Sequence, residues 1–354
     1  MYARRHRWAV AGDIAMRDAL MANSFLLLPW QDSAVSDWMS RVRLAQNGHA
    51  YLLTHESPAE AHLFAERLSA LMVCAELAAT KPCRECRGCR LREQSAYGDL
   101  LIVEKEEGKT AIGIDQIRLA ARFLQQTALF GSHKILLIKD AEAMTQAAAN
   151  SLLKTLEEPP GSSVLFLTSS MPWRLSATVR SRCQRLRTAV ASTEASSLFL
   201  LSNGIAQADA SAALAYFPGR PVDALAACTS GALESAMAID ASCVALWQSR
   251  EGPYLPPSVW LNEEPADVLA RLLGTVESNL GSMDTLTLRR SGRDWLLLHK
   301  CLGEVLSRLL SSANPSKDVL LGQVALLCGQ CGQPGFTDTA HGFLSVLGRP
   351  GFSG

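Results

Sequence analysis

The chain has 354 residues, of which 48% are hydrophobic and 19% are charged, a composition typical of a globular protein with domains of ~150 residues each. Its 34 basic and 34 acidic residues cancel, which excludes an overall electrostatic field that would attract nucleic acid or a membrane surface. Any such contact must therefore come from a local patch or from a partner.

The first thirty residues have the pattern of neither a secretion signal nor a membrane span. Asp13, Arg17 and Asp18 interrupt the apolar run that a secretory signal requires, and the later run "FLLLPW" is short and contains Pro29. We therefore expect a cytoplasmic protein whose ten cysteines are reduced thiols or metal ligands. Residues 1–24 are predicted to be a flexible N-terminal extension.

Apolar runs of strand length alternate with segments of helical period in the first half of the chain. Strands that are apolar throughout and separated by helices indicate a parallel sheet covered on both faces. After about Ala191 nearly every segment has a helical pattern. We predict an α/β domain at 25–190, a small helical domain at 191–232 and a larger helical domain at 233–354. The predicted strands are 49–54, 99–104, 134–140 and 163–170, and the predicted helices between them are Pro58–Val73, Asp115–Gln126 and Ala143–Glu158.

The first strand runs into a helix, where a nucleotide-binding protein carries the phosphate loop G-x-x-x-x-G-K-[ST]. Pro58 has no N–H to offer to a phosphate, and a carboxylate at Glu60 would repel one. Residues 57–60 instead have the pattern of a capping box with proline at the first helical position. Two interpretations stay open. Either this segment keeps the structure of a phosphate-binding site but has lost the residues that bind phosphate, or this strand and helix never had a role in nucleotide binding. The four loop positions hold His55, Glu60, Ala61 and His62.

The third predicted strand, in "KILLIKDAEAM", ends at Asp140. Nucleotidases of this topology carry Asp-Glu there, Asp for the metal ion and Glu to polarise the attacking water. Here Ala141 occupies the Glu position, and Glu142 is one residue late, so we expect its side chain to point elsewhere. Asp140 is then a remnant of a metal site or simply a turn residue.

Four cysteines within sixteen residues have the spacing Cys74-x8-Cys83-x2-Cys86-x2-Cys89. Four thiolates can hold one tetrahedral zinc ion, and such a closed site stabilises a fold rather than catalyses a reaction. We predict a structural zinc knuckle inserted after the first helix, the alternatives being free buried thiols or a redox pair. The later pair Cys328 and Cys331 has no further ligands nearby, and we interpret it as core or chance.

The predicted knuckle is basic. This charge favours either a nucleic-acid patch or a solvated surface that offsets the thiolate charge. Its basic residues are Lys81, Arg84, Arg87, Arg90 and Arg92.

The cysteine spacing, "ANSLLKTLEEPP" at 149–160 and "TVRSRC" at 178–183 occur together in this chain. In these motifs it resembles the delta-prime subunits of the bacterial DNA polymerase III clamp loader. The resemblance implies an AAA+ module at 25–190 with the knuckle at 74–89, a lid domain at 191–232 and an oligomerisation (collar) domain at 233–354. It also implies partners: gamma/tau and delta subunits in a five-membered ring that uses ATP to load the sliding clamp on primed DNA. The chain would then be an accessory subunit of a DNA-directed DNA polymerase.

The departures from the ATP-binding members imply a subunit that binds no ATP and has no catalysis of its own. "FPGRPVDAL" carries Val222 where the lid arginine is expected, with Arg220 two positions early. The resemblance further implies that Arg182, in Ser181-Arg182-Cys183, is an arginine finger that acts in trans on the ATP of a neighbouring subunit. Alone, an arginine in this context would be an ordinary surface residue. Arg180 and Arg185 are not expected to share the role, and Cys183 is expected to pack.

Two other functions stay open on the sequence. A working ATPase with an atypical loop would bind ATP as an isolated chain. A zinc-dependent nucleic-acid-binding module would show salt-sensitive DNA binding that is lost on charge reversal at Arg84 and Arg87.

Overall fold

The computed structural model describes residues 28–44, 48–76, 80–106, 108–131, 133–249, 254–309 and 316–347. These residues form two compact units, one ending at Ala227 and the other beginning at Cys228. The predicted extension at 1–24 lies outside the described residues. The predicted division into three domains stays a prediction.

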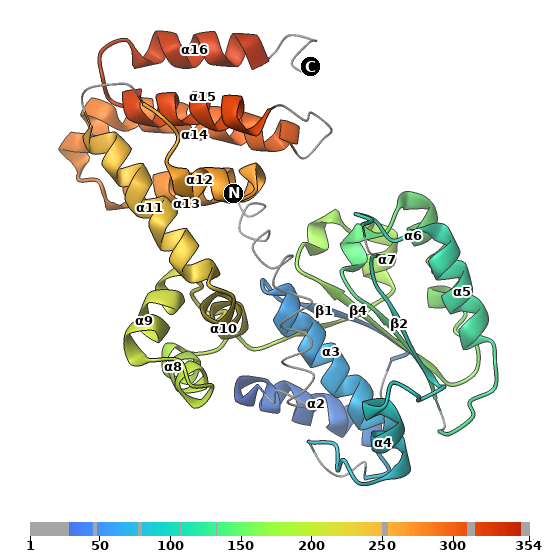
Figure 1. Cartoon of the computed structure of the whole chain (residues 1–354). Coiled ribbons are helices and arrows are strands. Elements are labelled where there is room, and N and C mark those ends of the chain that lie inside the picture. The colour runs from blue at the N-terminus through green and yellow to red at the C-terminus, as the bar shows by residue number, and fades with distance from the viewer. Residues whose placement is uncertain are drawn as a thin grey trace. The chain divides into compact units, whose positions relative to one another are not determined.

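The first unit is built on a five-stranded parallel sheet with strand order β2-β3-β4-β1-β5 (Figure 1). Four of its strands are the predicted apolar runs. The fifth was missed because its sequence, "QRLR", has one apolar residue and lies at the sheet edge, where little of a strand is buried. The strands are β1 (Ala50–Thr54), β2 (Leu100–Val103), β3 (Lys134–Ile138), β4 (Ser163–Ser169) and β5 (Gln184–Arg187).

Helices cover both faces of this sheet, as predicted (Figure 1). Successive residues of a strand point to opposite faces, so Leu52 of β1 packs in one core cluster and Leu53 in another. The fold class predicted from the sequence is therefore confirmed. One face carries α2 (Asp32–Arg43) and α3 (Pro58–Val73), and the other carries α5 (Ile114–Leu124), α6 (Gln146–Glu157) and α7 (Ala177–Ser181).

Local signals set the helix ends. Pro58 is the first residue of α3, as predicted, and Ser57 is its N-cap. Helix α6 begins three residues later than predicted, because the Thr145 side chain caps it by accepting from the Ala148 N–H. The shorter elements of this unit are the 3-10 helices η1 (Pro29–Gln31), η2 (Ala141–Ala143) and η3 (Pro172–Arg174) and the helix α4 (Arg87–Glu93).

The rest of the described chain is helical, as predicted. In the first unit α8 (Thr193–Ser202), α9 (Gln207–Tyr216) and the start of α10 (Pro221–Ser230) follow the sheet. The second unit packs its own core around fully buried residues such as Trp260 and Leu302. Its helices are α11 (Ala232–Gln248), α12 (Ser258–Asn262), α13 (Pro265–Ser282), α14 (Thr285–Leu309), α15 (Lys317–Gln330) and α16 (Phe336–Leu347).

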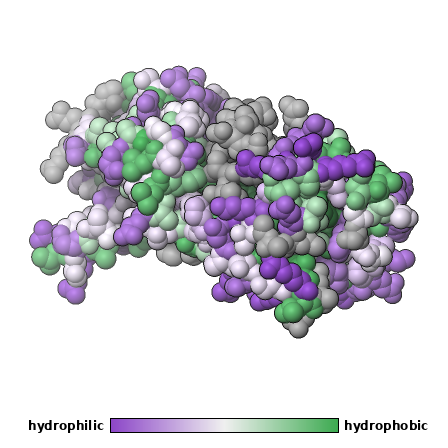
Figure 2. Space-filling model, turned by 90° about the horizontal axis from the view of Figure 1, so that it is seen from below, coloured by the Kyte–Doolittle hydropathy of each residue, from purple (hydrophilic) through white to green (hydrophobic). Residues whose placement is uncertain are grey.

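The described residues include no single helix with the length and apolar composition of a membrane span, although α10 and α11 counted together as a bent pair meet that test. Figure 2 shows the face seen from below, where hydrophilic residues alternate with small separate groups of hydrophobic ones.

The parallel arrangement brings the carboxyl ends of the strands to one edge of the sheet. His55 comes directly after β1 and Ser170 directly after β4, and Asp140 is the second residue after β3. In open α/β sheets ligands bind at this edge, so the residues there decide what the unit can hold.

Candidate functional site

The amino end of α3 is closed by side chains of the protein itself. Ser57 accepts from the Glu60 N–H at 3.2 Å, and the Ser57 N–H donates to Nδ1 of His55 at 3.0 Å. Only half of the predicted capping box forms, because the Glu60 side chain does not reach back to the Ser57 N–H. The backbone donors that a phosphate would need are therefore already engaged or, at Pro58, missing.

Glu60 turns its carboxyl group into the protein, where the residue is fully buried. The indole N–H of Trp30 donates to Oε2 of Glu60 at 3.1 Å, while Oε1 has no hydrogen-bond partner among the described residues. Burial, reinforced by the nearby carboxylate of Asp223, raises the pKa of Glu60 to about 8. At neutral pH the group is thus largely a neutral acid, which removes the cost of a buried charge.

His55 beside it is also held neutral. Burial lowers the pKa of His55 to about 4. Since its Nδ1 accepts from the Ser57 N–H, the neutral ring carries its proton on Nε2, which lies 3.6 Å from Oε2 of Glu60. The loop position that should be glycine is thus filled by a buried imidazole.

Residues from α10 complete this enclosure. The Ser57 hydroxyl donates to Oδ1 of Asp223 at 2.9 Å, and Asp223 also pairs with Arg220, whose Nη1 lies 3.4 Å from Oδ2. Trp30 meets the ring of Phe199 from α8 edge to face, with centroids 5.4 Å apart. Val222, at the expected position of the lid arginine, is fully buried. Side chains thus connect the start of α3 with α10, and η1 with α8.

At the expected metal position the carboxylate of Asp140 is paired with side chains of the protein itself. Oδ1 of Asp140 lies 3.0 Å from Nε2 of His62, and Oδ2 lies 3.0 Å from Nζ of Lys105. Although burial opposes it, His62 and Lys105 lower the pKa of Asp140 below its usual value, so the carboxylate stays ionised. His62 stands at the loop position whose hydroxyl would bind Mg²⁺, and Asp140 itself adopts a left-handed backbone, with φ 50°.

Glu142 points away from this cluster, as expected. Its Oε1 accepts from the backbone and hydroxyl of Ser170 and from the Met171 N–H, at 2.9 to 3.3 Å. This carboxylate fixes the end of β4 and is not placed beside Asp140.

Arg182 lies apart from the α3 site, at the C-terminal cap of α7 on the other face of the sheet. Its side chain is 34% exposed; Nη1 donates to the Thr178 carbonyl at 3.0 Å, and Nη2 pairs with the carboxylate of Glu157. The adjacent Cys183 is buried in the core between the sheet and α6, as expected.

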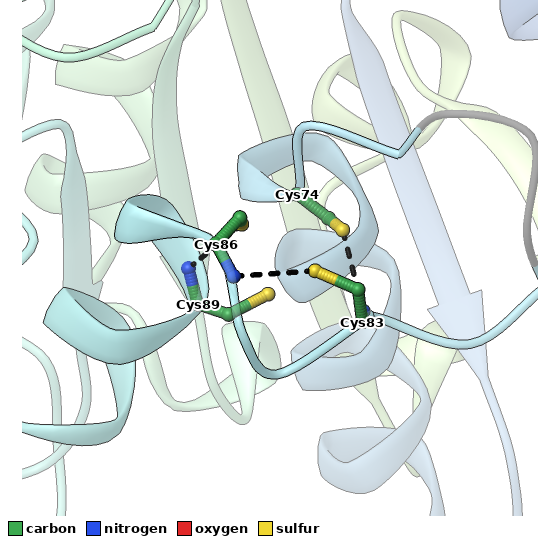
Figure 3. A group of neighbouring side chains, drawn as sticks. All are labelled: Cys74, Cys83, Cys86 and Cys89. Carbon is green, nitrogen blue, oxygen red and sulfur yellow. Dashed lines mark hydrogen bonds between the residues drawn. The ribbon is translucent and has the colours of Figure 1, made fainter.

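The four predicted metal-ligand cysteines do converge (Figure 3). Cys74 follows α3, Cys83 lies in the insertion, and Cys86 and Cys89 belong to the start of α4. Their sulfur atoms all lie within 4.8 Å of one another. Four sulfurs at the Zn–S distance of ~2.3 Å would be about 3.8 Å apart, so a small inward rotation brings them onto one ion. The cluster can therefore hold a metal ion.

Backbone donors in the knuckle favour thiolates. The N–H groups of Cys83, Cys86 and Cys89 donate to the sulfurs of Cys74, Cys83 and Cys86 at 3.3 to 3.4 Å. Burial raises the pKa of Cys74 and Cys89. It opposes ionisation of Cys86 as well, but hydrogen bonds from Ala75 and Cys89 lower the pKa of that thiol to about 6.

The knuckle is fastened to α3. Gly88 is required where α4 crosses the end of α3, because a Cβ there would lie 2.4 Å from the Val73 carbonyl oxygen. Arg67, which is 3% exposed, donates to the Thr80 carbonyl at 3.1 Å and pairs with Asp32. Arg92 donates to the Glu66 carbonyl at 3.3 Å.

The remaining pair, Cys328 and Cys331, is buried in the core of the second unit, near Cys243. It forms no part of the clusters described above.

Sequence reasoning missed the residues that hold these side chains in place. Trp30, Lys105, Glu157 and Asp223 come from four different segments. Each of them contacts a residue between 25 and 166 positions away in the sequence. A local sequence pattern cannot predict contacts over such distances. Glu157 lies in the motif "LEEPP" and Asp223 in "FPGRPVDAL", but neither motif indicated the contact that its residue makes.

Glu60 and His55 predict a specific dependence of stability on pH. With a folded pKa of about 8 against an ordinary 4.5, Glu60 contributes stability that is lost as pH rises toward 8. With a folded pKa of about 4 against 6.5, His55 contributes stability that is gained as pH rises to 6.5. The two trends cancel between about 4.5 and 6.5. From pH 6.5 to 8 His55 no longer contributes a change, and Glu60 by itself contributes a fall of about 2 kcal/mol in the free energy of unfolding.

Glu60→Gln should abolish this fall, because an amide does not titrate. Urea unfolding at a series of pH values across that window, followed by circular dichroism, measures the difference from wild type. Glu56→Gln is the matched control, since Glu56 is exposed. An unchanged fall in Glu60→Gln would show that Glu60 is not the titrating group.

The comparisons with known proteins agree with this geometry. The sequence family described as "DNA polymerase III, delta subunit" matches residues 30–191, which contain the α3 site, the four knuckle cysteines and Arg182. DNA polymerase III subunit delta' of Pseudomonas aeruginosa is 41% identical over 157 residues, which cover 44% of this chain and 47% of that protein. The Escherichia coli subunit delta' is 39% identical over 143 residues, 40% of this chain and 42% of its own length.

A match also exists outside the delta-prime group. DNA polymerase III subunit tau of Bacillus subtilis is 28% identical over 141 residues, 39% of this chain and 24% of that protein. The aligned part of this chain spans less than half the length of each of these relatives. Over its first half, this chain is similar to the delta-prime subunits of bacterial DNA polymerase III, and the resemblance indicated by its motifs is confirmed there.

Proposed function

We propose that this chain is a clamp-loader subunit of the delta-prime type that binds no ATP and supplies an arginine to the ATP site of a neighbouring subunit. It would assemble with gamma/tau and delta subunits and help to load the sliding clamp on primed DNA. In this proposal residues 191–232 form the lid domain and residues 233–354 form the collar domain. The complex loads the clamp in the cytoplasm. The observation that carries the proposal is the buried carboxyl of Glu60 where a phosphate would lie.

Two features support the absence of ATP binding. A triphosphate would need the N–H groups that the side chains of Ser57 and His55 already occupy. It would also meet the neutral carboxyl of Glu60 and the methyl group of Ala61 at the positions where a phosphate loop has glycine and lysine. The Mg²⁺ that accompanies ATP would compete with His62 and Lys105 for Asp140. These contacts argue against a working ATPase with an atypical loop.

Arg182 is the proposed finger. Its planar guanidinium can bind two phosphate oxygens at once and stabilise charge that develops during phosphoryl transfer. The partly exposed position at the end of α7 leaves it accessible to another subunit. In a chain that binds no ATP itself, such an arginine can act only on ATP that an adjacent subunit binds.

We also propose one structural zinc ion per chain, held by Cys74, Cys83, Cys86 and Cys89. The ion would neutralise the thiolates and fix the path of the chain between α3 and α4. All four positions would be protein ligands, so no site for water or substrate is left.

The alternative, a nucleic-acid-binding knuckle, has less support. Arg92 is turned into the protein toward Glu66, and the Arg87 guanidinium lies 5.2 Å from the ring centroid of Phe130. Exposed Glu85 and Glu93 lie among the remaining basic residues. Lys81, Arg84 and Arg90 are exposed as well, and the two acidic side chains among them reduce the positive charge of that surface.

The isolated chain should not bind ATP even at millimolar concentration. A ligand at 100 times its dissociation constant raises stability by about 2.7 kcal/mol, so a thermal melt with Mg²⁺ and ATP detects binding readily. Ala61→Lys should not restore binding, because Ala61 is fully buried beside Glu60. A gamma/tau-type subunit is the positive control, and an ATP-dependent rise in the melting temperature of the wild-type chain would refute this prediction.

Cys86→Ser should lose the zinc and loosen the knuckle while the C-terminal unit stays folded. Elemental analysis of protein purified without chelator measures the metal, and limited proteolysis across 74–93 measures the loosening. Cys228→Ser, outside the cluster, should keep one zinc per chain. Zinc-free wild-type protein would contradict the proposal.

Arg182→Ala should leave the subunit folded and assembled but reduce clamp loading and the DNA-stimulated ATPase of the reconstituted complex. An arginine finger contributes about 10³–10⁵ in rate at the site it serves, whereas other intact sites would dilute the fall in bulk turnover. Arg182→Lys should recover little, since an ammonium lacks the planar fork. Arg185→Ala, an exposed arginine on β5, is the control. Wild-type loading by the Arg182→Ala complex would refute the role.

A further inference from the structure

The proposed finger is held by its own chain. Arg182 caps α7, Glu157 is the last residue of α6, and the two helices pack side by side (Figure 1). Nη2 of Arg182 pairs with Oε1 of Glu157, and Nη1 donates to the Thr178 carbonyl at 3.0 Å. Both terminal nitrogens of the guanidinium thus have an acceptor on this chain.

This arrangement conflicts with two-pronged binding of a phosphate. Bidentate recognition uses two N–H groups on one edge of the guanidinium. In the structure a carboxylate already bonds one of the terminal nitrogens, and its negative charge would repel an approaching phosphate. For Arg182 to present its fork to an anion, the Glu157 carboxylate has to leave.

The exchange is energetically easy. The Glu157 side chain is 50% exposed and that of Arg182 34%, so water screens the pair. Exposed ion pairs of this kind change an equilibrium by about two- to five-fold, which is 0.4 to 1 kcal/mol at 1.4 kcal/mol per tenfold. A phosphate with more than one negative charge can displace such a carboxylate.

We propose that Glu157 is a positioning residue that keeps Arg182 withdrawn in the free subunit and yields it to the γ-phosphate of a nucleotide bound by a neighbouring subunit. This inference rests on the proposed function of Arg182 and adds its regulation. Glu157 lowers activity when the neighbouring site is poorly saturated with ATP, and has little effect once bound ATP has displaced it.

The ion pair between Glu157 and Arg182 is tested on the isolated chain. Glu157→Gln keeps the size of the side chain and removes its charge, so the arginine-selective reagent phenylglyoxal should modify Arg182 two- to five-fold faster than in wild type. Peptide mass spectrometry identifies the modified residue. Glu158→Gln is the matched control, because Glu158 is the adjacent exposed carboxylate and makes no contact with Arg182 among the described residues. Equal rates in wild type and Glu157→Gln would overturn the inference.

The regulation is tested in the reconstituted complex. Glu157→Gln should lower the ATP concentration for half-maximal ATPase two- to five-fold and leave the maximal rate nearly unchanged. The double variant with Arg182→Ala should behave as Arg182→Ala alone. If Arg182→Ala has no effect, the proposed function fails. If Arg182→Ala impairs loading while Glu157→Gln matches wild type or impairs it too, the finger stands and the withdrawal by Glu157 is wrong.

Discussion

The closed amino end of α3 is the constraint on which the rest of the functional interpretation depends. A helix begins with unpaired N–H groups and a partial positive charge, and this is the feature that phosphate-binding proteins use. Here the side chains of Ser57 and His55 accept the N–H groups of Glu60 and Ser57 at that end. The neutral carboxyl of Glu60 is buried beside them and accepts from Trp30, and Ser57 donates to Asp223. Because this end of the helix is filled and hydrogen-bonded by the chain itself, we propose that the unit keeps this architecture without binding a nucleotide.

At the carboxyl edge of the sheet, side chains of the protein likewise take the place of a ligand. In a working site a divalent cation would face the aspartate at the end of β3, whereas His62 and Lys105 face Asp140 here. The carboxylate keeps its ionised form because two side chains of the protein supply the compensation. Glu60, which is fully buried and lies near the carboxylate of Asp223, stays protonated instead. The two buried carboxyl groups thus differ in charge: Asp140 stays ionised, and Glu60 stays protonated.

The features proposed to act on other molecules lie on separate elements. Arg182 sits at the end of α7 on one face of the sheet, and the cysteine cluster lies beyond α3 on the other. The knuckle is bound to α3 through Gly88, Arg67 and Arg92. The proposed zinc would therefore rigidify the same helix whose other end is closed by Ser57 and His55.

The sequence by itself determined the fold class, four of the five strands, the start of α3 and the convergence of the cysteines. These depend on local signals: apolar runs, a proline at the first turn, and ligands close in the chain. It did not predict β5, whose polar sequence pairs only because β1 offers it an open edge. Nor did it reveal that Glu60 turns away from the Ser57 N–H toward Trp30, or that Glu157 holds Arg182. Such contacts join residues distant in sequence, and the direction of a buried polar side chain depends on which partners the tertiary structure brings within hydrogen-bonding distance.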